Sequence, residues 1–300
     1  MNATKARRRE PLNPITWLGR AAVIVITGFF VVFFLLPIIW LVIAASKSPH
    51  DLITTAPFAP GTFADLASNW TQLVTFQDGI VFRWLENSAY YSLAALALTL
   101  LTTIPAGYAL ALNEFRGRKL LLTTTLVVML IPNTALVLPI FLELSAVHLI
   151  GQPLAVILPF AFYPFGVYLT YIYFSTTVPR DLLDAARIDG CGEIKVFTQV
   201  ALPLATPVVA LVGFFSFVAN WNNFFLPFLT VPGAKEPIQV GLTELLSNVP
   251  AFNPTSTGVT AIELPTLAVA ALLAVTPVLL VFLFSQRFLV AGLTAGGTKE

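Results

Sequence analysis

The sequence predicts an all-α integral membrane protein with six transmembrane helices, and three observations carry this prediction. Hydrophobic residues make up 57% of the chain and charged residues only 10%, whereas charged residues are about a quarter of an ordinary soluble protein. Apolar runs of about 20 residues, long enough to cross a bilayer, recur along the chain. Most of the basic residues gather in alternate connections between these runs.

The predicted spans are separated by short polar connections and by two long ones. We place the spans at residues 21–45, 87–112, 120–145, 152–176, 203–227 and 265–287. The long connections are 46–86, expected to be partly structured with an interfacial helix near Trp84, and 228–262. A basic segment, 1–20, precedes the first span. That span is about 25 residues long, too long for the core of a cleaved signal, which has about 7–15 residues.

The distribution of Lys and Arg predicts the orientation in the membrane. With six spans, both termini lie on the same side as the connections 113–119 and 177–200. That side holds 13 of the 16 Lys and Arg residues, and cytoplasmic segments carry the excess of positive charge. We therefore expect both termini and the 177–200 segment to be cytoplasmic.

Several kinds of chemistry have no residues to support them. Cys191 is the single cysteine, so the chain has no intrachain disulfide. No GxxxxGK[ST] phosphate-binding motif occurs, so nucleotide binding by this chain is not expected. Both histidines lie outside the predicted spans, and no catalytic constellation is visible at depth. We expect no catalytic residue, no metal, no cofactor in this chain and no nucleic acid partner.

The stretch from Pro179 to Pro203 is the most informative part of the chain. Pro179 suits the first turn of a helix, and Gly190 suits the position just past a helix end, where it can turn the chain through a positive φ. Between them, one helix face carries mostly small residues that suit docking into a groove. This face consists of Leu182, Ala185, Ala186 and Asp189. A second short helix is expected at 193–199, and a solvated loop between membrane helices remains the alternative.

The same stretch resembles the EAA motif of ABC importer permeases. That motif reads E-A-A, three residues, G, nine residues, I, one residue, L-P, and the spacing here is the same. Asp184 replaces the usual Glu, and Val200 replaces Ile. In the family, this cytoplasmic coupling helix sits in a cleft of the ATPase subunit. The resemblance implies ATPase coupling by Asp184, Ala185, Ala186, Gly190, Leu202 and Pro203.

The C-terminal sequence is similar to the ending of the MalG-like branch, the second permease of carbohydrate importers. Residues 113–118, 164–167 and 220–223 resemble the same branch, so the resemblance covers nearly the whole chain. It implies a permease core at 87–290 and a cytoplasmic tail at 291–300. In that branch the tail contacts the ATPase dimer, which implies this role for Gly296, Gly297 and Lys299.

The resemblance also implies a function and a set of partners. The chain would be a non-catalytic permease subunit of an importer for a sugar or oligosaccharide, in the inner (plasma) membrane of a bacterium. Its partners would be the lipid bilayer, a second, MalF-like permease subunit, an ATPase dimer and an extracytoplasmic solute-binding protein. The ATPase would bind the ATP and Mg. The binding protein would meet the last outer connection.

Four polar or aromatic residues in the predicted spans are candidates for the solute pathway. Asn133 lies about 13 residues into its span, roughly 20 Å deep, where an amide needs a partner from another helix or from a solute. Asn220, Trp221 and Asn223 lie toward an outer end, with both amides on one face and the indole placed to stack on a sugar ring. Interhelical contact for Asn133 and an aromatic belt at the headgroups for the others are the alternatives.

Prolines inside the predicted spans favour kinks, because each removes a backbone hydrogen bond. Bent helices that line a cavity are one interpretation, and ordinary tolerance of proline in membrane helices is the other. These prolines are Pro105, Pro132, Pro139, Pro159, Pro164, Pro207 and Pro277.

Three other functions remain as rivals. A permease for glycerophosphodiester- or polyol-type solutes belongs to the same superfamily and would be favoured by a basic cavity. An ion-coupled secondary transporter needs ionisable residues near the midplane. An intramembrane enzyme needs a catalytic constellation at depth. The deep positions of this sequence offer Asn and Pro, which favours the binding-protein-dependent importer.

Overall fold

The computed structural model describes residues 14–255 and 261–295, and every regular element within them is helical. The predicted all-α class is therefore confirmed for this part of the chain. The longer helices are α1 (Pro14–Ala45), α3 (Phe63–Thr75), α4 (Ile80–Leu112), α5 (Arg118–Met129), α6 (Asn133–Ala146), α8 (Pro164–Thr176), α12 (Thr206–Trp221) and α15 (Leu264–Ala295). The shorter elements are α2 (Pro49–Thr54), η1 (Phe76–Gly79), α7 (Leu154–Ile157), η2 (Leu158–Phe160), α9 (Arg180–Ile188), α10 (Glu193–Lys195), η3 (Val196–Ala201), α11 (Leu202–Leu204), α13 (Phe225–Thr230), η4 (Gly233–Lys235) and α14 (Ile238–Ser247).

The described chain has four helices long and apolar enough to cross a membrane, or up to six if each of two bent pairs counts as one span. The first and last predicted spans, 21–45 and 265–287, lie within α1 and α15. The span predicted at 87–112 lies within α4, which begins earlier, at Ile80.

Two predicted spans, 120–145 and 203–227, are not straight helices. α5 and α6 meet at an angle of 106° beside Pro132, which has no backbone N–H and disfavours helical geometry at the residue before it. The helical stretch that ends with α11 meets α12 at 79°, at Ala205, and α12 ends at Trp221. Hydropathy predicted the apolar runs but not these changes of backbone direction.

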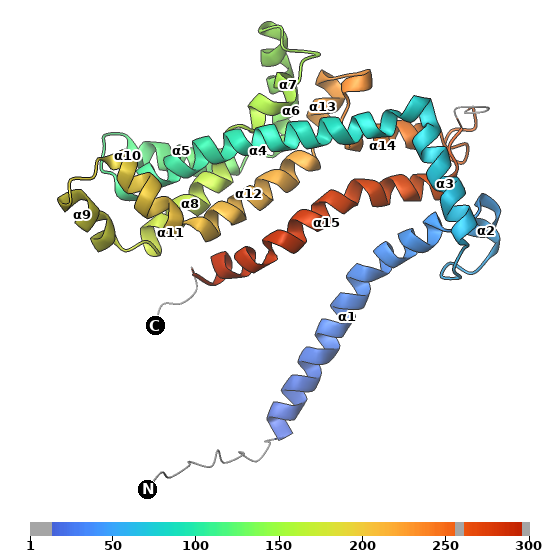
Figure 1. Ribbon diagram of the computed structural model, residues 1–300, viewed down its shortest axis with the longest axis horizontal. Coiled ribbons are helices and arrows are strands. Elements are labelled where there is room, and N and C mark those ends of the chain that lie inside the picture. Colours follow the sequence, from blue (N-terminus) through green and yellow to red (C-terminus); the bar gives the residue numbers. More distant parts are fainter. Residues whose placement is uncertain (1–13, 256–260, 296–300) are drawn as a thin grey trace.

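α4 is the central helix of the bundle, and α8 and α12 pack along it (Figure 1). α15 packs against α12, and α1 leans away from the bundle and contacts it near Ala44 and Ala45. Glycine permits the closest approach: a Cβ on Gly107 of α4 would lie 2.5 Å from Cβ of Thr170 in α8. α4, α8 and α12 therefore make a tight core that connects the end of the molecule carrying α9 with the end carrying α14.

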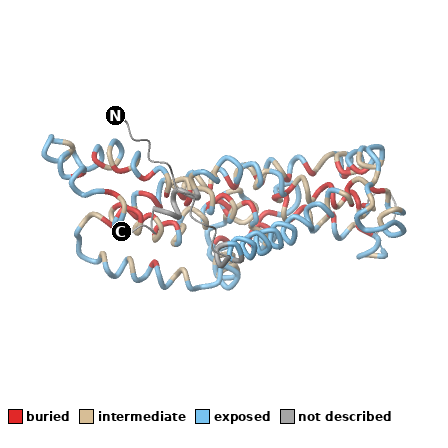
Figure 2. The backbone as a smooth tube through the Cα atoms, turned by 90° about the horizontal axis from the view of Figure 1, so that it is seen from below, coloured by how far each residue is buried: buried red, intermediate tan, exposed pale blue. Residues whose placement is uncertain are grey.

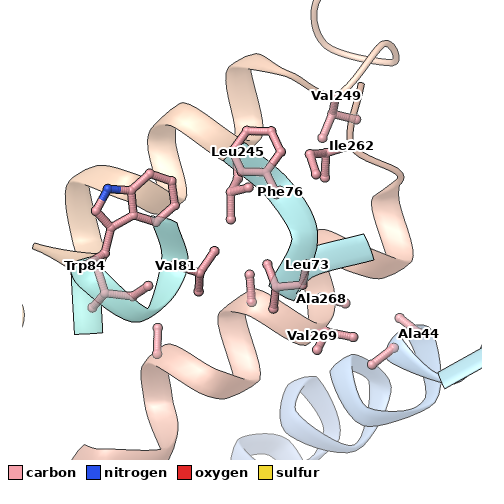
Figure 3. Packing of buried hydrophobic residues seen from close by; sticks show 14 of the residues in the cluster. Ala44, Leu73, Phe76, Val81, Trp84, Leu245, Val249, Ile262, Ala268 and Val269 are labelled. Carbon is pink, nitrogen blue, oxygen red and sulfur yellow. The ribbon is translucent and has the colours of Figure 1, made fainter. Parts of the chain in front are cut away.

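The largest hydrophobic cluster lies at the α14 end (Figure 3). The sequence predicts an interfacial helix near Trp84, but Trp84 lies in the second turn of α4 and is fully buried. It is buried because α14, from the connection 228–262, folds over it. Ser88 and Asn87 hold that connection in place: Ile238 N donates to Ser88 Oγ at 2.8 Å, and Asn87 Nδ2 donates to two backbone oxygens at 2.9 Å.

The connection 46–86 is also folded, with α2 and α3 docked onto the end of α1. Lys47 is only 1% exposed, and its Nζ donates to Ala56 O at 2.8 Å. Asn69 Nδ2 donates to Ala45 O and Lys47 O, both at 2.9 Å. Buried polar groups need such partners, and here they fasten the connection to α1.

Much of the outer surface is apolar, as a bilayer requires. Buried residues lie inside the bundle and exposed residues cover its outside (Figure 2). In α1, none of the most apolar window within Gly19–Ala45 is buried inside the chain. A continuous apolar surface of this size suits contact with lipid or with another membrane protein rather than with water.

Candidate functional site

Residues 177–200, called the 177–200 segment below, fold as two short helices joined by a tight turn. α9 begins at Arg180, directly after Pro179, and ends at Ile188. The second helix begins at Glu193 and continues through η3, a π-helical stretch, into α11. The predicted pair of helices is therefore present.

The turn explains why the motif needs glycine at its fixed distance from the two alanines. Gly190 adopts φ +82°, as predicted, in a left-handed conformation that is costly for other residues. Its N–H donates to Arg187 O at 3.0 Å, and Cys191 N donates to Ala186 O at 3.0 Å. This is a Schellman motif, in which the two residues after the helix satisfy its last carbonyls.

The 177–200 segment attaches to the bundle through an apolar face. Leu183 and Val196 are buried, at 1% and 0% exposure, in a cluster with Tyr108 and Phe174. Not all of the predicted docking face points outward, because Ala186 packs partly against the same cluster. Its other members, Leu182, Ala185 and Asp189, are exposed.

Two exposed isoleucines that were not predicted as site residues extend the outward surface of the segment. Ile188 is 86% exposed at the end of α9, and Ile194 is 80% exposed at the start of the second helix. Isoleucine in a charged connection between two apolar runs was the signal that could have identified them. Together with Leu182 and Ala185, they give the segment an apolar outward surface beside Asp181 and Asp189.

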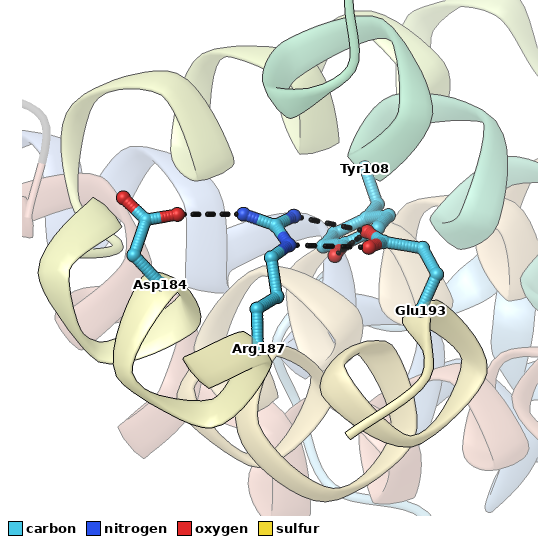
Figure 4. A network of polar contacts seen from close by, with 4 residues as sticks. All are labelled: Tyr108, Asp184, Arg187 and Glu193. Carbon is cyan, nitrogen blue, oxygen red and sulfur yellow. Dashed lines mark hydrogen bonds and ion pairs between the residues drawn. The ribbon is translucent and has the colours of Figure 1, made fainter. Parts of the chain in front are cut away.

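A polar network joins the two helices of the segment to α4 (Figure 4). Arg187 lies at its centre, with Nη1 2.8 Å from Asp184 Oδ1 and Nη2 3.1 Å from Glu193 Oε1. Tyr108 OH, from α4, donates to Glu193 Oε1 at 2.6 Å. The hydrogen bond to Glu193 is the main cause that raises the pKa of Arg187 above its ordinary value. Half-exposed ion pairs contribute only about 0.2–1 kcal/mol, so the network orients the helices more than it stabilises them.

Leu202 and Pro203, the last residues of the motif, lie where the segment joins the membrane bundle. Leu202 is partly buried against the Tyr108 cluster, and Pro203 is exposed. Tyr173 OH of α8 donates to Leu204 O at 3.0 Å, so α8 is hydrogen-bonded to the last residue of α11. The bend of 79° into α12 follows immediately.

A second candidate site is a pocket of about 770 Å³ where three helices are interrupted. We call it the three-break pocket. The interruptions lie between α5 and α6, between η2 and α8, and between α12 and α13. Its lining at these breaks includes Ile131, Asn133, Phe162, Tyr163, Asn222, Asn223 and Phe224. Pro132 and Pro164 adjoin two of the breaks, whereas Pro105, Pro139 and Pro277 lie inside uninterrupted helices.

The three-break pocket brings together three of the four residues predicted for a solute pathway. Asn133, Asn220 and Asn223 all line it, although they come from two distant parts of the sequence. Asn220 Nδ2 already donates to Ser216 O, at 2.8 Å. Asn223 Nδ2 is buried and has no hydrogen-bond partner within the described residues. An unpaired buried amide is costly, which marks Asn223 as the group here that most needs a partner.

Trp221, predicted to lie in the solute pathway, is not among the residues that line the three-break pocket. Its ring is only 3% exposed and stacks on Phe217, with 5.6 Å between the ring centroids. Its Nε1 donates to Ala274 O of α15 at 2.9 Å. It therefore neither lines the pocket nor belongs to an aromatic belt, because α15 covers that side of α12.

The lining of the three-break pocket is mostly apolar, with amide and hydroxyl groups among the apolar side chains. Among the described residues that line it, there is no Asp, Glu, Lys, Arg or His. Its aromatic rings come from Phe160, Phe162, Tyr163, Phe165, Phe224 and Phe225. Sequence reasoning missed these rings, since phenylalanine is common throughout the chain and gives no local signal. Amides that bond hydroxyl groups, beside rings that cover an apolar face, suit an uncharged polar solute.

Two predicted elements cannot be placed. Gly296, Gly297 and Lys299, predicted to contact an ATPase, lie outside the described residues, as do the basic residues at 1–13. Within the described residues, no group of three or more His, Cys, Asp or Glu could hold a metal ion.

These features define a class: a helical membrane protein with a helix–turn–helix at one end and an uncharged pocket at its helix breaks. Residues 103–295 match the family described as the binding-protein-dependent transport system inner membrane component. The chain belongs to this family, as the sequence resemblance predicted. It is accordingly a bacterial inner membrane protein that serves as a transport subunit rather than an enzyme.

Individual relatives agree with this assignment over almost their full lengths. The chain is 33% identical over 288 residues to the arabinooligosaccharides transport system permease protein AraQ of Bacillus subtilis, covering 92% of this chain and 95% of the relative. It is 30% identical to the sulfoquinovosyl glycerol transport system permease protein SmoH of Agrobacterium fabrum, covering 96% and 94%. A crystal structure of a bacterial ABC transporter that imports the acidic polysaccharide alginate contains a chain of the same fold. The TM-score is 0.76, with 21% identity and coverage of 96% of this chain and 100% of that chain.

Proposed function

We propose that this chain is one permease subunit of an ATP-driven importer for an uncharged sugar or oligosaccharide. The second permease subunit would complete the pore, and a separate ATPase dimer would bind ATP and Mg. An extracytoplasmic binding protein would deliver the solute. The family supports the dependence on a binding protein, and the names of relatives, such as that of the arabinooligosaccharide permease, support a carbohydrate.

The proposed topology has six spans, with each bent helix pair counted as one. Both termini would be cytoplasmic, because 13 of the 16 Lys and Arg residues fall on that side. The course of the helices supports this arrangement: α1 runs away from the end that carries α9, and α15 runs back toward it (Figure 1). The 177–200 segment would then face the cytoplasm.

The 177–200 segment is the proposed contact with the ATPase. Its Schellman turn at Gly190 fixes the angle between the two helices. The exposed surface around Leu182, Ala185 and Ile188 is the part that would enter the cleft of the ATPase. Asp184 would act through its ion pair with Arg187. Leu202 and Pro203 would pass movement of the segment to α12, whose other end lines the three-break pocket.

The composition of the three-break pocket is the observation that supports an uncharged solute. Asn133, Asn220 and Asn223 offer both donors and acceptors, as sugar hydroxyl groups require. The rings of residues such as Tyr163 and Phe165 offer surfaces on which a sugar ring can stack. The names of relatives include both arabinooligosaccharides and sulfoquinovosyl glycerol, so the names alone do not fix the charge of the solute.

The rival solutes fit the pocket less well. A glycerophosphodiester is an anion, and the described lining offers it no Lys, Arg or His. An anion in an uncharged, largely apolar site is strongly disfavoured unless a cation accompanies it. An ion-coupled transporter would need an ionisable group in the pocket, and the described lining has none.

Isolation of the complex from its native membrane tests this proposal. The binding protein that co-purifies is denatured, and the released solute is identified by mass spectrometry. We expect an uncharged sugar or oligosaccharide. A phosphodiester or another anion would contradict the proposal and favour the rival permease. Uptake of the identified solute into vesicles should then require ATP and survive an uncoupler, whereas loss of uptake with the uncoupler at unchanged ATP would favour a secondary transporter.

A further inference from the structure

The second helix of the 177–200 segment is held at its two ends by two tyrosine hydroxyl groups. At its start, Tyr108 OH of α4 donates to Glu193 Oε1 at 2.6 Å. At its far end, Tyr173 OH of α8 donates to Leu204 O at 3.0 Å. The chain then bends by 79° into α12. The bend is the point at which the second helix could pivot relative to α12. Tyr108 contacts Glu193, at the end of the second helix that lies farthest from this bend.

Tyr108 itself has little freedom to move. It is 4% exposed, with its ring edge-on to Phe174 at 5.3 Å and against Phe197 at 4.9 Å between centroids. The ring fixes the position of the hydroxyl group, and the hydroxyl group fixes Glu193. Because Glu193 also binds Arg187 through both carboxylate oxygens, α9 is held by the same contact.

This contact has no polar substitute elsewhere in the segment. Within the described residues, the bond from Tyr108 to Glu193 is the only hydrogen bond that joins residues 180–199 to α4, α8 or α12. The other attachments of these residues to the bundle are apolar and are made by side chains such as Leu183 and Val196. Apolar contacts permit sliding more readily than a directional hydrogen bond does.

We propose that Tyr108 is a positioning residue that fixes the orientation of the 177–200 segment relative to α4. The inference rests on the proposed coupling function, because orientation matters only if the segment transmits movement of the ATPase. The bond makes the two short helices and α4 move as one unit. Without it, the segment pivots at Ala205, and docking of the ATPase displaces the segment instead of α12.

Tyr108→Phe is the direct test, because it removes the hydroxyl group and keeps the ring in its cluster. Tyr171→Phe is the matched control: Tyr171 packs against the same cluster, but it is not part of the network with Glu193. Both variants are purified as complete complexes and reconstituted in lipid. The measured quantity is the rate of MgATP hydrolysis with and without the co-purified binding protein, normalised to the amount of assembled complex.

We expect the Tyr108→Phe complex to retain its ATPase subunits. Stimulation of ATP hydrolysis by the binding protein should fall about fivefold, because the loss of one hydrogen bond shifts an equilibrium by about this factor. Tyr171→Phe should match the wild type. Glu193→Ala, measured alongside, should reduce stimulation further, because it removes the acceptor for Tyr108 OH and also the contact with Arg187. The double variant of Tyr108 and Glu193 should be no worse than Glu193→Ala alone, since the bond that Tyr108→Phe removes is already absent there.

A spectroscopic measurement separates positioning from a general loss of structure. Since Cys191 is the single cysteine, Cys191→Ser gives a background for spin labels at Leu101→Cys on α4 and Ile194→Cys on the segment, both exposed positions. We expect a narrow distribution of label distances in this background and in Tyr171→Phe. Tyr108→Phe should broaden the distribution without lowering the thermal stability of the complex.

The outcomes distinguish this inference from the proposed function. Ala185→Arg, on the exposed surface of the segment, should prevent co-purification of the ATPase. If Ala185→Arg does so and Tyr108→Phe matches the wild type in both stimulation and label distances, the positioning role is wrong and the coupling function stands. If Ala185→Arg leaves the ATPase bound and stimulated normally, the coupling function fails and the inference fails with it. Loss of the ATPase from Tyr108→Phe itself would also contradict a positioning role. If Tyr108→Phe does not fold, Glu193→Ala, which removes the acceptor of the same bond, decides the question.

Discussion

A Cβ atom on Gly241 would lie 2.2 Å from Cδ2 and Cε3 of Trp84, so the backbone of α14 rests directly on the indole ring. Trp84 is fully buried and in contact with Phe76, with 6.5 Å between the ring centroids. It therefore has little room to move away. This contact closes the α14 end of the molecule, where the connection 228–262 folds over α4.

Gly241→Ala should destabilise the protein, because overpacking of a closed core costs about 1–3 kcal/mol. Thermal unfolding of the purified chain in detergent measures the effect. Gly28→Ala is the control, since a Cβ on Gly28 meets nothing within 4 Å. Equal unfolding temperatures for Gly241→Ala and the wild type would show that α14 does not rest on Trp84 in this way.

Gly190→Ala should weaken the 177–200 segment through its backbone. Gly190 has φ +82°, and a non-glycine residue in the left-handed region costs about 1–2 kcal/mol. Gly192 is the matched control, because its φ is −69° and a Cβ there meets nothing within 4 Å. We expect less ATPase to co-purify with Gly190→Ala than with Gly192→Ala. The turn has no special role if the two amounts are equal.

Asn223 lines the three-break pocket and Trp221 does not, so substitutions at these two residues should have different effects. Asn223→Leu should leave folding intact, because Asn223 Nδ2 has no partner within the described residues. It should raise the half-saturation concentration of uptake several-fold, since a hydrogen bond to a neutral group is worth about 0.5–1.5 kcal/mol. The measurement is uptake of the identified solute against its concentration, normalised to assembled complex. An unchanged curve would remove Asn223 from the pathway.

Trp221→Ala should act on stability instead. Trp221 is buried between α12 and α15, and truncation of a buried Trp costs about 3–5 kcal/mol. We expect a lower unfolding temperature and less complex, with the half-saturation concentration of the remaining complex unchanged. A raised half-saturation concentration at normal stability would return Trp221 to the solute pathway.

Local features of the fold could be predicted from the sequence because they depend on residues close together in the chain. Gly190 after an amphipathic helix predicted a turn with positive φ, and the structure has it. The apolar runs of α1 and α15 predicted long helices. Pro132 predicted a kink, but proline alone does not give its angle: Pro105 lies in an uninterrupted helix, while α5 and α6 meet at 106°.

The sites depend on contacts between distant residues, which the sequence does not specify. Asn133 and Asn223 line one pocket only because two helix breaks meet there. Trp221 looked like an exposed aromatic residue because its neighbours are amides, and only the packing of α15 reveals that it is buried. The bond between Tyr108 and Glu193 joins residues 85 positions apart, and neither residue stands out in its own stretch.

Cross-linking at Ala185 tests the central claim, that the 177–200 segment docks on an ATPase, most directly. In the Cys191→Ser background, a photoactivatable reagent is attached to Ala185→Cys in the native complex. Phe63→Cys is the control, since Phe63 is 85% exposed in α3, at the other end of the molecule. We predict an adduct between this chain and an ATP-hydrolysing subunit from position 185 and none from position 63. Absence of the adduct at 185, or equal adducts at both positions, would contradict the account.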